Sequence, residues 1–300
     1  MSSNLGIPTK SESKLSADAS LTEVIQGMLF GLGDCSKPLL TTAKMIETLL
    51  LQQMTVLLDQ LEEIAMRRDS TKIEMQDIVF LMRKDKAKLT RLLNVIDLKD
   101  NKNWNVQSDL ESPNENGLTK TKAPKRKEKC LLFLQSIGVS GVCATFPDDD
   151  YILKERRVRN DNISESLSIS NGDYGEFVYS RSISFFSKEN KAKLWDALKR
   201  IAPGPVSKLK SNTEDFISFL AKETIAYVID FALLVRQDKS VIPGDPFSRA
   251  RAQFKVDKIP AITPEEVKEV ARRYFSNQLC PSGIFARSTT CFFEKKLMVC

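Results

Sequence analysis

Side chains that could carry out covalent or acid–base chemistry are few in this sequence. It contains no histidine, and its six cysteines are scattered without a C-x-x-C pair. Histidine is the usual general base and metal ligand near neutral pH, so its absence excludes Ser-His-Asp and Cys-His catalysis and most zinc sites. The phosphate-binding patterns G-x-x-x-x-G-K-[ST] and G-x-G-x-x-G do not occur either. We therefore expect no catalytic site, no metal, no cofactor and no small-molecule substrate.

The charged side chains favour binding over catalysis. The 45 basic and 39 acidic residues leave a net charge of +6, which is mild for a protein that wraps DNA by its overall charge. The acidic run 148–150 consists of consecutive residues, which alternate in direction and usually mark a solvated turn. Residues 1–20 are polar rather than a signal sequence, and no apolar run reaches the ~18 residues of a membrane span. We expect an intracellular protein without a membrane segment.

A long amphipathic helix is the clearest element that could position a binding surface. Between residues 39 and 64, apolar residues recur every three or four positions, which predicts one apolar stripe along about seven helical turns. Similar patterns in 21–32 and 75–82 predict a short helix on either side. This short–long–short order resembles the histone fold, which is stable only as a pair. The residues expected to pair are Leu39, Ile46, Leu50, Met54, Leu57, Leu61, Ile64 and Ile78.

The loop before the third helix also resembles that of histone-like proteins. In residues 71–85, Asp77 occupies the place where an acidic residue usually ties the loop to the helix. Arg68 and Lys72 are its candidate partners, and we expect the salt bridge to form with Arg68. Glu74 stands in the N-cap position, where serine, threonine or aspartate would cap the helix better.

A second long helix is predicted from Asp215 to Asp238. It is apolar almost all round, which predicts burial, and its charged residues exclude a membrane span. Within it, Glu223 is either satisfied by a local ion pair or displayed to a partner. A further helix begins near Thr263, with Pro264 in its first turn. The residues expected to pair in this second unit are Phe216, Leu220, Tyr227, Phe231, Leu234 and Val267.

These patterns predict an all-α chain with two histone folds that form an intramolecular handshake pair, joined by a long, partly disordered linker. The predicted segments are a disordered N-terminus (1–20), a first histone fold (21–98), a linker with a basic stretch (99–173), a second histone fold with an aromatic lead-in (174–275) and an unassigned tail (276–300). The last helix of the first fold, 84–98, carries a basic face that we expect to be solvated; the alternative is a contact with nucleic acid or an acidic partner.

Two stretches leave alternatives open. Residues 120–129 contain six basic side chains, which suits a nuclear localisation signal at Lys125, Arg126 and Lys127 or a solvated basic tether. The aromatic stretch 174–187 could stack nucleobases. Packing against a neighbouring core is the more economical interpretation.

The blocks 81–86, 182–185, 220–224 and 233–238, with Gly244-Asp-Pro-Phe-Ser248, resemble the suppressor-of-Ty protein three family. This family is the histone-fold subunit of the SAGA transcription coactivator, and the resemblance covers 21–98 and 174–275. It implies a nuclear, non-enzymatic subunit that binds TATA-binding protein, delivers it to RNA polymerase II promoters and contacts other histone-fold and scaffold subunits. Glu223 then becomes a possible contact for TATA-binding protein.

Two other functions compete with this adaptor role. A histone-fold DNA-binding or architectural chromatin protein would need basic residues at the paired loops, and Arg67, Arg68 and Lys72 are candidates. At the start of the second long helix, however, Glu214 and Asp215 would repel phosphate. An enzyme using carboxylates would need a cluster of acidic groups in a pocket, and the sequence offers no such constellation.

Overall fold

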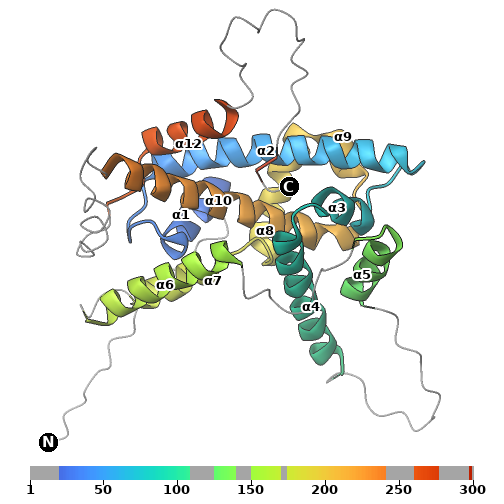
Figure 1. The fold of residues 1–300 in the computed structure, drawn as a ribbon, viewed down its shortest axis with the longest axis horizontal. Coiled ribbons are helices and arrows are strands. Elements are labelled where there is room, and N and C mark those ends of the chain that lie inside the picture. The colour runs from blue at the N-terminus through green and yellow to red at the C-terminus, as the bar shows by residue number, and fades with distance from the viewer. Residues whose placement is uncertain are drawn as a thin grey trace, which may run out of the picture.

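The computed structural model describes residues 20–108, 125–139, 150–169, 174–240, 260–276 and 297–298. Within these ranges every regular element is a helix, so the prediction of an all-α chain is confirmed for them (Figure 1). In chain order the helices are α1 (Leu21–Leu32), α2 (Leu40–Arg67), α3 (Met75–Met82), α4 (Lys86–Ser108), α5 (Arg126–Ser136), α6 (Tyr151–Ile169), α7 (Tyr174–Ser182), α8 (Lys188–Ile201), α9 (Pro203–Ser207), η1 (Ser211–Thr213), α10 (Glu214–Ser240) and α12 (Pro264–Ser276).

The first three helices follow the predicted short–long–short order. Ser20 caps α1 through a capping box, and Gly33 ends it at φ 117°, a left-handed conformation that suits glycine. Because α2 begins at Leu40, Pro38 precedes this helix and does not occupy its first turn. The carbonyl of Pro38 accepts a hydrogen bond of 2.7 Å from Gln26 Nε2, which anchors the α1–α2 loop to α1.

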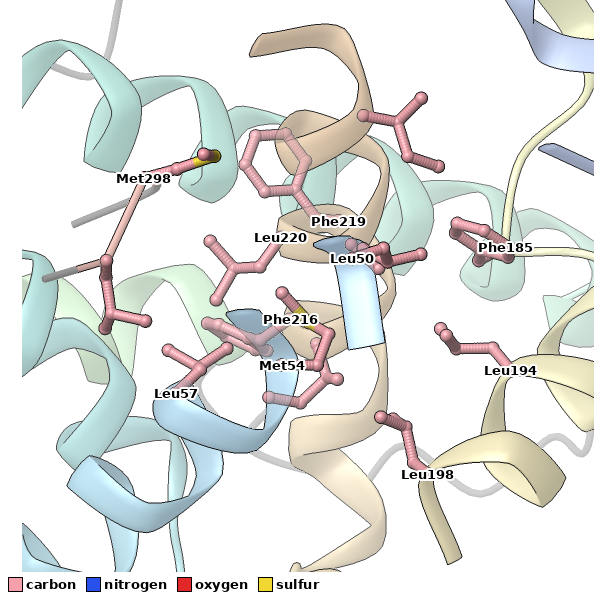
Figure 2. Packing of buried hydrophobic residues seen from close by; sticks show 14 of the residues in the cluster. Leu50, Met54, Leu57, Phe185, Leu194, Leu198, Phe216, Phe219, Leu220 and Met298 are labelled. Atoms are coloured by element: carbon pink, nitrogen blue, oxygen red, sulfur yellow. The ribbon is translucent and has the colours of Figure 1, made fainter. Parts of the chain in front are cut away.

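The hydrophobic core contains both long helices, α2 and α10, with α8 packed beside them (Figure 2). Leu50, Met54 and Leu57 of α2 lie in one cluster with Phe216 and Leu220 of α10, and all five are buried. Full burial of such a side chain stabilises a fold by roughly 1.5–3 kcal/mol. Contacts between the two distant parts of the chain are therefore a major source of its stability.

A parallel backbone bridge joins two loops beside the long helices. The Ile73 N–H donates a hydrogen bond of 2.9 Å to the carbonyl of Lys208, and the Ile73 carbonyl accepts one of 3.2 Å from the Lys210 N–H. The Ile73 side chain is buried in the main core. The bridge therefore fixes the α2–α3 loop to the loop before α10.

The residues predicted to pair differ in burial. The buried ones are Ile46, Leu50, Met54, Leu57, Leu61, Ile78, Phe216, Leu220 and Val267, while Ile64 and Tyr227 are half-buried. Burial was wrongly predicted for Leu39, Phe231 and Leu234, which are 39%, 37% and 51% exposed. Leu39 precedes the first turn of α2 as its N-cap residue. The other two lie on the side of α10 that faces an open groove.

The segment predicted as a partly disordered linker, 99–173, contains helices. α4 continues to Ser108, and α5 and α6 lie wholly inside the segment. The apolar pattern concealed them because they bury few large side chains: Cys130 and Leu134 in α5, and Ile163 in the described part of α6. Ion pairs with other helices hold both of them in place.

The aromatic lead-in packs into the fold through α7. Phe177 is fully buried against Phe30 of α1, with ring centroids 5.1 Å apart. The Oγ of Ser180 accepts a hydrogen bond of 2.7 Å from the N–H of Gly31. A Cβ atom at Gly31 would lie 2.6 Å from the backbone nitrogen of Arg181, so this close approach requires glycine. Core packing, and not base stacking, accounts for Phe177.

In the part of the chain that the structure describes, no helix is long and apolar enough to cross a membrane. The same ranges hold no group of three or more histidine, cysteine, aspartate or glutamate side chains that could bind a metal ion. Their charged side chains instead form ion pairs between helices, and one set of these pairs joins α4, α6 and α10.

Candidate protein interface

Glu223, a predicted contact for TATA-binding protein, is buried inside the chain. Its Oε1 accepts hydrogen bonds of 2.9 Å from Arg91 of α4 and 3.1 Å from Arg156 of α6. Its Oε2 accepts a second hydrogen bond of 3.1 Å from Arg156. The local ion pair is thus the correct alternative, and the prediction of a displayed Glu223 is wrong because both oxygens face arginines of the same chain.

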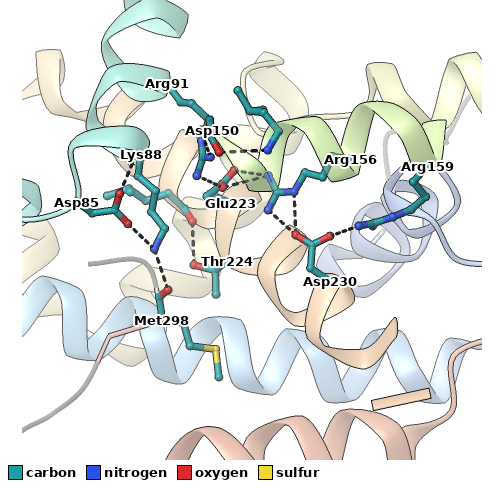
Figure 3. A network of polar contacts seen from close by, with 12 residues as sticks. Asp85, Lys88, Arg91, Asp150, Arg156, Arg159, Glu223, Thr224, Asp230 and Met298 are labelled. Atoms are coloured by element: carbon teal, nitrogen blue, oxygen red, sulfur yellow. Dashed lines mark hydrogen bonds and ion pairs between the residues drawn. The ribbon is translucent and has the colours of Figure 1, made fainter. Parts of the chain in front are cut away.

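These contacts extend into a larger arginine–carboxylate network (Figure 3). Arg91 Nη1 donates a hydrogen bond of 2.6 Å to Oδ2 of Asp150, the residue before α6. Arg156 Nε donates a hydrogen bond of 2.8 Å to one carboxylate oxygen of Asp230 in α10, and Arg159 Nη2 donates one of 2.7 Å to the other. Arg159 also donates a hydrogen bond of 2.8 Å to the carbonyl of the last residue of α1. The members of the network are Arg91, Arg156, Arg159, Asp150, Glu223 and Asp230.

The network balances three arginines against three carboxylates. Burial alone would lower the pKa of Arg156, but the nearby carboxylates of Glu223 and Asp230 outweigh burial and raise it. The guanidinium therefore remains charged. Removing one partner from a buried ion pair costs about 3–5 kcal/mol because the other charge is left unpaired. The network thus fixes α6 firmly against α4 and α10.

The basic face predicted to be solvated on the helix after α3 is partly buried. Lys88 and Arg91 are both buried. The ammonium of Lys88 lies 3.1 Å from the carboxylate of Asp85 and 4.5 Å from the ring centroid of Tyr227. The prediction is wrong for these two residues because Asp85 and the ring of Tyr227 contact Lys88, and the distant carboxylates of the network contact Arg91.

A groove of about 570 Å³ opens between α6 and α10. Phe231 and Leu234 line it from α10, and Tyr151 and Val158 line it from α6; all four side chains are exposed. A cluster of exposed large apolar side chains is typical of a protein-binding site. We call this surface the α6–α10 groove.

The arginine–carboxylate network supports the α6–α10 groove. Arg159 and Asp230 belong to the network and also line the groove. Their ion pair holds α6 and α10 at a fixed separation. A groove whose walls are already in place loses little conformational entropy when a partner binds, which favours affinity.

The predicted salt bridge between Arg68 and Asp77 is present in the structure. Arg68 Nε and Nη2 each donate a hydrogen bond of 2.9 Å to a different carboxylate oxygen of Asp77. Asp77 Oδ2 also accepts a hydrogen bond of 2.8 Å from the N–H of Glu74. Other basic residues around the bridged loops are paired as well. The further pairs are Lys208–Glu62, Lys210–Glu74 and Arg67–Glu63.

The residues of the predicted nuclear localisation signal begin α5. Lys125 is the N-cap residue of this helix. Arg126 Nη1 donates a hydrogen bond of 2.8 Å to Asp215 of α10, and Lys127 Nζ donates one of 3.0 Å to Asn94 of α4. In this fold the cationic groups of Arg126 and Lys127 are therefore engaged by other helices, and the nuclear localisation signal stays a prediction.

Asp215 is the centre of a second ion cluster. Burial alone would raise the pKa of its carboxyl, but hydrogen bonds from Lys99, Arg126 and Lys191 outweigh burial and lower the pKa to about 2. These cations come from α4, α5 and α8. The negative charge at the start of α10, which the sequence suggested would repel phosphate, is thus neutralised from within the chain.

Comparison with known proteins shows which families this chain resembles. Residues 19–109 match the family model described as transcription initiation factor IID, 18 kDa subunit. The chain is 24% identical over 261 residues to SAGA complex subunit Spt3 of Drosophila melanogaster, covering 83% of this chain and 62% of the fly protein. It is 24% identical over 252 residues to SAGA complex subunit SPT3 of Saccharomyces cerevisiae, covering 73% of this chain and 74% of the yeast protein. The chain is similar to the Spt3 family of SAGA subunits.

A shorter match to the Spt3 family is closer in sequence. SAGA complex subunit Spt3 of Schizosaccharomyces pombe is 40% identical over 76 residues, which is 25% of each chain. The matches to the fly and budding-yeast relatives are longer than the first 98 residues, so they extend beyond the first predicted histone fold.

The sequence contains a signal for the network that helical periodicity does not reveal. Arg156 and Arg159 were not predicted as site residues, although the segment 154–159 is rich in basic residues. Glu223 and Asp230 are seven residues apart, which places two carboxylates two turns apart on one face of an apolar helix. Such carboxylates require buried partners. The basic segment of α6 supplies them.

Proposed function

We propose that the chain is a non-enzymatic coactivator subunit that serves as a histone-fold scaffold in a SAGA-type complex. In this role it binds TATA-binding protein and delivers it to promoters for RNA polymerase II initiation. The similarity to Spt3 proteins and the match of residues 19–109 support the coactivator role. The family resemblance suggests neighbouring histone-fold and scaffold subunits as further partners, and the nucleus as the location.

Within this role, the segments 21–98 and 174–275 form an intrachain pair of histone folds. The observation that carries this inference is the parallel bridge between Ile73 and Leu209, which joins the loop after one long helix to the loop before the other. α8, α10 and α12 repeat the short–long–short order of α1, α2 and α3. The buried cluster shared by α2 and α10 supports the same pairing.

The α6–α10 groove is the surface that we propose for contact with TATA-binding protein. Phe231 and Leu234 point away from the core shared by α2 and α10, so a partner can reach them without disturbing the pair. Partners that assemble reversibly commonly bury apolar side chains at the centre of the contact. The network behind the groove keeps its walls in position.

A double variant tests this surface. Phe231→Asp with Leu234→Asp places two charges in the groove, and we expect capture of TATA-binding protein in a pull-down to fall at least tenfold. The matched control is Ile201→Asp on α8, which is 47% exposed and lies outside the groove. Capture by the double variant at the level of the control would contradict a role for the groove.

Separating the two halves tests the pairing. The halves are co-expressed as two chains cut near Asn114, outside the described residues, and TATA-binding protein is then offered in a pull-down. Co-purification of the halves one to one, with capture at moderate salt, is the expected result. Insoluble or self-associating halves would contradict the intrachain pair. Co-purification without capture would keep the pair and contradict the proposed partner.

The bridged loops disfavour the alternative of a histone-fold DNA-binding protein. Arg67, Arg68, Lys208 and Lys210 there each pair with a carboxylate of the same chain, although the Arg67 pair is solvent-exposed. Lys72, the third predicted candidate, is itself exposed. Phosphate would have to compete with these carboxylates for the cations. We therefore do not include direct DNA contact in the proposed function.

A further inference from the structure

Two residues of the tail that showed no pattern in the sequence are buried in the core. Leu297 and Met298 are only 5% and 4% exposed and belong to the same hydrophobic cluster as α2 and α10. Figure 2 draws Met298 among these core side chains. The pair therefore occupies a site built by residues far away in the sequence.

The backbone of this dipeptide is held by side chains from three helices. The N–H of Met298 donates a hydrogen bond of 2.8 Å to Gln53 Oε1 of α2. The carbonyl of Leu297 accepts a hydrogen bond of 2.7 Å from the hydroxyl of Tyr274 in α12. The carbonyl of Met298 accepts a hydrogen bond of 3.4 Å from the ammonium of Lys88 in α4, as Figure 3 shows.

Gln53 is the most informative of these residues. It is 1% exposed on an otherwise apolar side of α2. A buried amide without a hydrogen-bond partner is strongly unfavourable. The N–H of Met298 supplies a partner for its oxygen, so this polar side chain is matched to a backbone group and not to a particular side chain.

We propose that Gln53, Lys88 and Tyr274 frame a peptide-binding slot for a segment with two consecutive large apolar side chains. The ligand of the slot in the isolated chain is the chain's own Leu297–Met298 dipeptide. Recognition combines hydrogen bonds to the peptide backbone with burial of the two side chains, the division of roles that is common in extended-peptide recognition. The slot is separate from the α6–α10 groove, although its Lys88 lies 4.5 Å from the ring centroid of Tyr227, which lines that groove. Its occupant is not the partner proposed for the groove.

A peptide supplied in trans tests the slot. The full chain with Leu297→Ser and Met298→Ser leaves the slot empty, and a fluorescein-labelled peptide of residues 294–299 is titrated by fluorescence anisotropy. We expect this variant to bind the peptide at least tenfold more tightly than the unaltered chain, whose own segment competes at high effective concentration. A peptide with the same two serine substitutions is expected to bind neither chain.

Two results would overturn the proposal. One is equal affinity of the peptide for the variant and the unaltered chain; the other is equal binding of the serine peptide. Should the double variant fail to fold, Gln53→Ala in a chain with an unaltered tail provides a second measurement. With ¹³C-methyl methionine labelling, the NMR chemical shift of the Met298 methyl group is expected to move towards that of a solvent-exposed methionine. An unchanged chemical shift would overturn the slot.

Discussion

Two successive stretches of α10 are stabilised by different interactions. The first stretch buries Phe216 and Leu220 in the apolar cluster shared with α2. The second stretch carries Glu223 and Asp230, which hold α4 and α6 through ion pairs. Apolar burial tolerates many side chains of similar volume, whereas a buried ion network tolerates the loss of none of its members. The two regions should therefore respond differently to substitution.

The largest expected effect is in the apolar region. Leu57→Asp places an unpaired carboxylate in the core and should lower the free energy of unfolding by about 5 kcal/mol, as measured by urea denaturation. Phe231→Asp, on the exposed side of the same pair of helices, should change it by less than about 1 kcal/mol. Equal destabilisation by the two variants would contradict the difference in burial between Leu57 and Phe231.

The ion network should show the next largest effect. Glu223→Gln removes the negative charge shared by Arg91 and Arg156 and should cost about 4 kcal/mol in the same experiment. Glu265→Gln changes an exposed glutamate on α12 and serves as the matched control. If both variants unfold at the same urea concentration, the network contributes nothing to holding α6.

Helix packing at Gly31 gives a smaller effect. Gly31→Ala introduces a Cβ atom 2.6 Å from the backbone nitrogen of Arg181, which must push α7 away from α1. We expect a loss of about 3 kcal/mol in the free energy of unfolding. Gly175→Ala, in α7 itself, meets nothing within 4 Å and should leave stability unchanged or slightly raised.

The smallest effect is a pH dependence at Asp215. Its pKa in the folded chain is about 2, below the ordinary value of 3.8, so its ion pairs stabilise the fold above pH 3.8 and are lost as the pH falls through 2. The unaltered chain should therefore lose about 2 kcal/mol of stability relative to Asp215→Asn between pH 4 and pH 2. A constant difference between the two chains across this range would contradict the low pKa.

The apolar region could be predicted from the sequence, and the charged region could not. Apolar spacing alone identified Ile46, Leu50 and Leu57 as buried, because helical periodicity is a local property. The same reasoning wrongly buried Phe231 and Leu234, since an almost uniformly apolar helix does not reveal which side stays open.

The candidate interface depended on contacts that local patterns do not record. Arg91 and Glu223 are 132 residues apart, and Arg91 and Asp150 are 59 apart. Nothing in the helical pattern of α4 distinguishes Arg91 from a solvated arginine. Its partners become evident only once α6 and α10 have been placed beside it. The salt bridge of Arg68 with Asp77 spans nine residues, and its local motif made it predictable.

Because α2 and α10 belong to one covalent chain, their contact does not depend on the amount of protein. Flexible linkers commonly hold two connected parts at an effective concentration of order millimolar, and the two parts lose less translational freedom on packing than separate molecules do. Dilution, which dissociates a pair of separate subunits, leaves this contact intact. A single copy can therefore enter an assembly with both long helices already in place, and the stoichiometry of its two halves is fixed at synthesis.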